Sequence, residues 1–306
     1  MATQFKKHSH KILIFCFMAI FSFGCTEELT DGLNNLLGKD KIIAGLKEAL
    51  NVGTKNATNM LGTDGGYRLD PTVFIDLPDE AKTTIDVASK VVGIINTVNS
   101  IPGVNSLIQS SGVDLSAFGS DLADNLISAF NRGAENAAPQ AANIFYEAIT
   151  RMSIADGKEI LFSSNNEAAT DYLYTNTSEG LTVAFAPIIN GTISEINVSV
   201  GGDSYDALGA WSVYAEQNNK LANLIHSESF QNILSSPLVA PFLGDKVNTI
   251  NSIQTTNTDL GDYVVGKALS GIFTKIGAEE LKIRTDINAR TSDLLREVFG
   301  EADKNK

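Results

Sequence analysis

Apolar residues recur at spacings of three and four along most of the chain, as they do in amphipathic helices that pack around a core. The clearest stripe covers residues 41–61, and Gly62, Gly65 and Gly66 follow it. The same periodicity predicts nine further helices, and Pro139 suits the first turn of one of them. They cover residues 79–98, 115–137, 139–152, 154–162, 167–174, 178–189, 207–226, 259–283 and 293–299.

Strand signals are few. Strict alternation occurs only at 196–200, which fits a short strand or a loop, and the segment 67–78, with two prolines, predicts an extended loop with at most one edge strand. Capping side chains at 291–293 and a glycine at 300 bracket the last helix. We therefore expect an all-α fold, a single multi-helix domain with orthogonal or bundle-like packing and at most one short β element.

The first 25 residues have the pattern of a secretion signal. Lys6, Lys7 and Lys11 precede or open an apolar run that is too short to span a bilayer, and the string Phe-Ser-Phe-Gly-Cys at 21–25 resembles a bacterial lipobox. That resemblance implies acylation of Cys25; an uncleaved membrane anchor is the alternative. The expected organisation is a signal peptide (1–24), a flexible tether from Cys25 (25–40), a helical domain (41–300) and a polar tail (301–306).

Cleavage would leave a strongly acidic protein. Without the three signal lysines, 20 of the 23 basic residues remain against 36 acidic ones, a net charge of −16. A polyanion is repelled by such a surface, so nucleic acid is excluded as a partner. Anionic headgroups are repelled too, and the membrane is therefore expected to be contacted through acyl chains on Cys25.

Cysteine and histidine are too scarce for several kinds of chemistry. Cys16 lies in the signal and Cys25 would be acylated, so no disulfide is expected in the mature domain. His8 and His10 leave with the signal, and His226 is the last histidine. A zinc site built on these residue types is excluded, and we expect no metal and no cofactor.

Two strings resemble catalytic motifs. Residues 261–268 nearly match a phosphate-binding loop, but the Ser or Thr after Lys267 is missing and the run continues into a helical pattern. Residues 202–204 resemble a serine-nucleophile string, whose only available base is His226. A helix for residues 261–268 and a turn for residues 202–204 are the simpler interpretations. His226 is best explained as the polar end of a helix.

Charged residues recur inside the apolar helices, where they must be paired. Glu280 and Arg284 lie one turn apart in the order that favours a helical ion pair. Ion pairs that fix helix register are the favoured interpretation, and a catalytic carboxylate pair is the alternative. The candidate polar cluster comprises Glu48, Arg132, Glu135, Glu147, Asp171, Glu279, Glu280, Arg284, Arg290 and Asp293.

Several segments, in order and spacing, resemble a bacterial lipoprotein family known as domain of unknown function 4197. This resemblance implies a helical, secreted, lipid-anchored protein and supplies no catalytic residues. The chain departs from the family pattern at Val265 and Ser270, and it has longer inserts near 99–118 and 191–256. The matching segments are 45–50, 132–139, 144–149, 262–264, 267–269, 279–284 and 289–300.

Two hypotheses for the function follow. The first is a lipid-anchored helical module of the cell envelope that interacts with a partner or binds a ligand. It is favoured over an enzyme because the sequence lacks the residues that conventional catalysis uses. The second is an envelope hydrolase that uses paired carboxylates. Two acids that face one open pocket without an arginine between them would favour the hydrolase. Arg284 or Arg290 between the two acids would favour the binding module. The expected location is the outer membrane, on the periplasmic side or, because Glu27 and Glu28 follow Cys25, the cell surface.

Overall fold

Helices form most of the described part of the chain, residues 38–98, 103–119, 121–257 and 260–304 of a computed structural model. The expected all-α fold with one small β element is therefore confirmed. The α-helices are α2 (Lys39–Leu61), α3 (Asp79–Val98), α4 (Val104–Ser111), α5 (Leu122–Ala137), α6 (Ala141–Arg151), α7 (Ile154–Leu161), α8 (Ala168–Glu195), α9 (Ala207–Ile225), α10 (Glu228–Leu234), α11 (Ala240–Leu243), α12 (Lys246–Asn251), α13 (Gly261–Thr285) and α14 (Asp293–Lys304).

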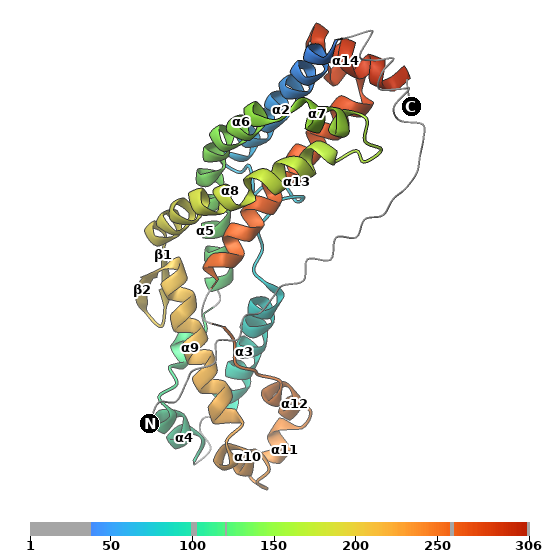
Figure 1. Cartoon of the computed structure of the whole chain (residues 1–306). Helices are drawn as coiled ribbons and strands as arrows, with labels where there is room; N and C mark the ends of the chain where they lie inside the picture. The colour runs from blue at the N-terminus through green and yellow to red at the C-terminus, as the bar shows by residue number, and fades with distance from the viewer. Residues whose placement is uncertain (1–37, 99–102, 120, 258–259, 305–306) are drawn as a thin grey trace, which may run out of the picture.

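The helices build an elongated molecule (Figure 1). At one end, α2 packs on α6, α7, α13 and α14, and α8 packs on α5 and α13. At the other end, α9 contacts α4 and α10, while α12 packs on α3. Helix α5 contacts both α8 and α9 and so connects the two ends.

The longest helix of the described residues, α8, replaces the two short helices expected at 167–174 and 178–189. The polar residues between those ranges looked like a break, but their hydroxyls bond within the helix. Thr175 Oγ1 donates to Asp171 O at 2.9 Å and Thr177 Oγ1 to Leu173 O at 2.6 Å. Pro187 lies inside the same helix on its exposed side. The expected break is therefore wrong, because side chains that often end helices are accommodated here.

Other boundaries also differ from the expected ones. The expected helix 115–137 is split into two elements. Asp114 caps a short 3₁₀ turn at Leu115–Ala117, and α5 begins at Leu122. Between them, Phe118 packs edge-on against Tyr214, with ring centroids 5.2 Å apart. Helix α2 starts two residues inside the expected tether. Helices α4, α10, α11 and α12 lie in regions where no helix was expected.

The last helix continues past the position where it was expected to end. Gly300 lies inside α14, which runs to Lys304, so residues 301–304 are helix and not a polar tail. Ala302 is buried, and Asp303 pairs with Arg290 at 2.7 Å. These contacts outweigh the cost of about 1 kcal/mol of one glycine in a helix.

The alternating segment forms a β-hairpin. β1 (Asn197–Val200) pairs antiparallel with β2 (Asp203–Asp206), and both connecting glycines have positive φ. Val198 and Val200 face the core, where β1 contacts α5 and α9. Asp206 then caps α9 by accepting from Gly209 N at 2.8 Å.

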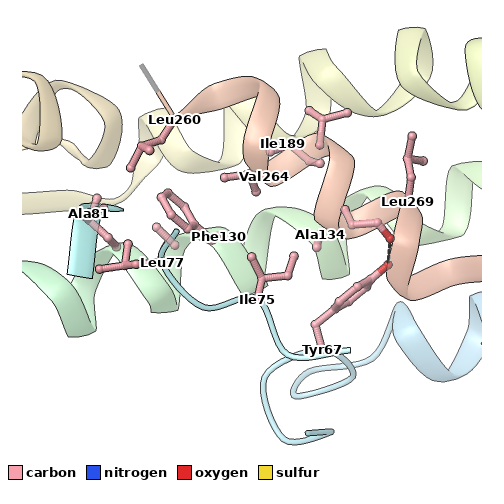
Figure 2. Close-up of a cluster of buried hydrophobic side chains, with 14 of the residues drawn as sticks. Tyr67, Ile75, Leu77, Ala81, Phe130, Ala134, Ile189, Leu260, Val264 and Leu269 are labelled. Carbon is pink, nitrogen blue, oxygen red and sulfur yellow. Dashed lines mark hydrogen bonds between the residues drawn. The ribbon is translucent and has the colours of Figure 1, made fainter. Parts of the chain in front are cut away.

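The loop between α2 and α3 is part of the core. Tyr67 is fully buried and its hydroxyl donates to Ala268 O of α13 at 2.7 Å (Figure 2). Gly271 makes room for this ring, since a Cβ there would lie 2.6 Å from Tyr67 Cε1. Figure 2 shows Ile75 and Leu77 of the loop with Phe130 of α5 in the same apolar layer.

None of the helices within the described ranges is both long and apolar enough to cross a membrane. The expected signal peptide and Cys25 lie outside these ranges.

Two glycines of α2 give matched stability predictions. A Cβ on Gly45 would lie 2.6 Å from Val298 Cγ2 of α14, whereas a Cβ on Gly53 would meet Glu279 Cβ at an ordinary 3.5 Å. Gly53→Ala should stabilise the protein by up to about 1 kcal/mol. Gly45→Ala should destabilise it by about 1–3 kcal/mol, because α14 must shift. Urea denaturation measures both; equal effects would show that α14 does not pack on Gly45.

Candidate functional site

The buried charges of the candidate polar cluster hold helix ends together. Glu135, Glu280, Arg284 and Arg290 are each at most 8% exposed. Burying a charge is costly unless it is paired and hydrogen-bonded, so the partners of these four residues show their roles.

Glu280 of α13 caps the start of α8. Its Oε1 accepts from Ala169 N at 3.0 Å, and its Oε2 accepts from Thr170 N and Thr170 Oγ1, both at 2.8 Å. The residue at the cap position itself, Glu167, makes no side-chain cap. A carboxylate at the positive end of a helix satisfies otherwise unpaired amides and the helix dipole together.

Arg284 carries the matching positive charge one turn along α13. Its Nε donates to Glu280 Oε1 at 2.8 Å. Its Nη2 donates to Ile160 O at 2.9 Å, at the C-terminal end of α7, and Nη1 points to Leu161 O at 3.5 Å. The pair therefore joins the end of α7 to the start of α8, with each charge at the helix end it complements.

Arg290 closes the end of α13 in the same manner. Its Nε donates to Ile283 O and its Nη2 to Arg284 O, both at 3.0 Å. Its guanidinium pairs with Asp303 and lies 5.7 Å from the ring centre of Phe299, both in α14. Arg290 thus fixes α14 to α13.

Two side chains of α5 hold the buried loop. Asn131 Oδ1 accepts from Ile75 N at 3.0 Å and its Nδ2 donates to Ile75 O at 2.7 Å, as a neighbouring strand would. One turn later, Glu135 Oε1 accepts from Tyr67 N and Arg68 N, both at 3.2 Å. Burial, and next to it the charge of Glu135, raises the pKa of Tyr67.

The same loop is tied to α13 from outside. Lys275 of α13 bonds Asp70 and also Thr72, and hydrogen bonds from Lys275 and then Thr72 lower the pKa of Asp70 to about 2. The carboxylate therefore stays charged in all but strongly acidic conditions.

The other candidates lie on the surface or at helix contacts. Arg132 pairs with Asp64 at 2.6 Å, and Glu279 joins α13 to α2 by accepting from Asn56 Nδ2 at 3.1 Å. Glu48 is half-buried on α2. The pairs Glu147–Arg151 and Asp293–Arg296 are exposed and within single helices, and Asp171 accepts from Asn165 Nδ2 at 2.8 Å.

The motif-like strings have structural roles. Residues 261–268 are the first two turns of α13, with no strand in front among the described residues, as the helical interpretation of this string expects. Ser204 lies on the hairpin that precedes α9, and His226 lies at the far end of this 19-residue helix, which is about 28 Å long. His226 ends α9 as expected, and its Nε2 bonds Ile253 O at 2.9 Å.

A groove of about 760 Å³ lies between α8 and α13, and polar side chains make up most of its lining. It begins beside the α8 terminus that Glu280 caps. Pockets for small molecules have such volumes. The lining residues are Glu167, Thr170, Asp171, Tyr174, Ser178, Glu179 and Thr182 of the α8 side and Gly266, Leu269, Ser270, Phe273, Thr274 and Gly277 of α13.

The two walls of the α8–α13 groove differ in chemistry. All three carboxylates come from the α8 side, while α13 contributes hydroxyls, glycines and two apolar side chains. Tyr174 is 57% exposed in the groove, and its ring packs edge-on against Phe273 with centroids 5.1 Å apart. No lysine, arginine or histidine is among the lining residues.

Sequence reasoning found only part of this groove. Asp171 was in the candidate cluster, and Ser270 was singled out because it departs from the family pattern. Glu167 and Tyr174 were missed although they share the expected helix 167–174 with Asp171, and Glu179 was missed because the break expected in α8 placed it on a separate helix. A continuous α8 would have placed them in one row.

These observations define a class of protein: an all-α domain whose helix ends are joined by buried charges, with an acidic groove between its two longest helices. The chain belongs to the family described as "Protein of unknown function (DUF4197)", which it matches over residues 36–105 and 103–300. No curated protein and no solved structure matches it.

The buried ion pair gives a stability prediction. Glu280→Ala would leave Arg284 buried without its partner and the first amides of α8 unpaired, so it should cost about 3–5 kcal/mol of unfolding free energy. Glu147→Ala, which removes an exposed pair of the same i,i+4 spacing, should cost about 0.5 kcal/mol or less. Urea denaturation compares them; similar losses would contradict the role given to Glu280.

Proposed function

We propose that this protein is a lipid-anchored binding module of the bacterial cell envelope, and that the α8–α13 groove is its ligand site. The observation that carries the proposal is the groove itself. It combines a volume of about 760 Å³, an exposed aromatic ring and a row of carboxylates and hydroxyls.

The rigidity of the groove supports a binding role. Buried Glu280 fixes the start of α8 to α13, and the Tyr174–Phe273 contact joins the same two helices further along. A site whose walls are already in place loses little conformational entropy when a ligand binds.

The anchor and the location rest on the sequence. The basic start, the short apolar run and the lipobox-like string before Cys25 support export and acylation. Helix α2 begins at residue 39, so the acylated end would be joined to the α2–α14 end of the molecule through a short tether. The outer membrane is the proposed location.

A hydrolase with paired carboxylates is the second candidate, and the groove offers one observation in its favour. Glu167 and Asp171 face it with no arginine in the lining. However, the carboxylates share one wall, whereas glycoside hydrolysis needs two that flank the scissile bond. The former candidate Glu280 is fully engaged by Arg284 and α8. The binding module is therefore the better-supported function.

Replacing Cys25 tests the anchor. Cys25→Ser expressed in a bacterial host should move the protein from the membrane to the soluble envelope fraction, because the acylated thiol is lost. Cys16→Ser, inside the expected signal, is the matched control and should leave the protein in the membrane fraction. Mass spectrometry of the mature N-terminus checks the acylation. An unmodified Cys25 in the wild-type protein would overturn the anchor.

Blocking the groove tests the ligand site. Ser270→Trp places a large side chain in the groove, and Ala278→Trp places the same side chain on an exposed position of α13 outside it. Spermidine, maltose, citrate and a neutral dipeptide would be tested by ligand-observed NMR with the full chain in detergent. At least one compound should bind wild type and Ala278→Trp but not Ser270→Trp. No such difference for any compound would overturn the groove as a site.

A further inference from the structure

The charge of the α8–α13 groove identifies the class of its ligand. Three carboxylates and no basic side chain line it, and Glu167 and Glu179 have no salt-bridge partner within the described part of the chain. An anion would meet repulsion there, in a chain whose net charge is −13. We infer that the groove binds a linear aliphatic polyamine, an inference that rests on the proposed binding function.

The spacing of the carboxylates favours several separated positive charges over one. Glu167 and Asp171 are one helical turn apart, and Glu179 lies eight residues after Asp171, about 12 Å further along α8. A single ammonium group reaches only one of these positions. A chain with ammonium groups at both ends can reach both.

The surface between the carboxylates suits methylene groups. Tyr174 and Phe273 form an aromatic contact between Asp171 and Glu179, and Leu269 lies on the same wall as Phe273. The exposed Tyr174 ring also attracts a cation over its face. The hydroxyls of Ser178 and Ser270 are acceptors for ammonium hydrogens.

A metal ion is the other cation to consider. A divalent ion needs several oxygen ligands around one point. The described residues contain no group of three or more His, Cys, Asp or Glu side chains that could hold one. The same separation that prevents the three carboxylates from sharing an ion suits an extended organic cation.

The test measures spermidine affinity by calorimetry on the full chain in detergent. Asp171→Asn/Glu179→Gln should weaken binding about tenfold, because two exposed charge contacts are lost. The matched control Glu147→Gln/Glu195→Gln removes the same net charge outside the groove, with Glu195 on α8 itself, and should leave affinity within about twofold. Tyr174→Phe should retain binding and Tyr174→Ala should weaken it. Propylamine, with one ammonium group, should bind far more weakly than spermidine.

The outcomes separate this inference from the proposed function. Equal losses in both double variants would mean general attraction to an acidic protein and would overturn the inference. A neutral or anionic compound that binds wild type but not Ser270→Trp, while spermidine does not, would overturn the polyamine and leave the binding module standing. If no compound is sensitive to Ser270→Trp, both proposals fail.

Discussion

The buried pair of Glu280 and Arg284 is the interaction on which the end of the molecule with α7, α8 and α13 depends. Two charges on one turn of α13 satisfy the first amides of α8 and the last carbonyls of α7. Removing charges from water costs several kcal/mol per ion, and the hydrogen bonds on both sides offset that cost only if both partners stay in place. The pair thereby holds α7, α8 and α13 in one relative position, and this arrangement sets the walls of the α8–α13 groove.

The same principle recurs elsewhere. Arg290 closes the end of α13 and Glu135 accepts from the backbone of the buried loop, so buried charges in this protein contact backbone groups as well as other charges. Such contacts are directional, whereas apolar packing is not, and they therefore select one arrangement of helices among several with similar burial. The carboxylates of the groove differ, since they lie in solvent on one exposed face of α8.

Periodicity in the sequence was enough to identify most of the long helices and the fold class, because these helices bury a continuous apolar stripe. It could not identify α10 to α12, which are too short to show a period. It also missed that α8 is one continuous helix, because this depends on hydroxyls that bond back to their own helix. The ion pair Glu280–Arg284 could be predicted from its spacing, but its contacts with α7 and α8 are made more than a hundred residues away. The groove required knowledge of how α8 and α13 cross, which no local pattern contains.

The packing of α2 has a consequence for how the chain folds. Its apolar face is covered in part by α13 and α14, which lie far later in the chain. Contacts between segments this far apart require closure of a long loop, which makes them late events in folding. During synthesis, part of the apolar face of α2 therefore stays uncovered until α13 and α14 have been made. Loss of α14 would likewise uncover part of α2, so a truncation before Asp293 would expose apolar surface on a helix that lies far away in the sequence.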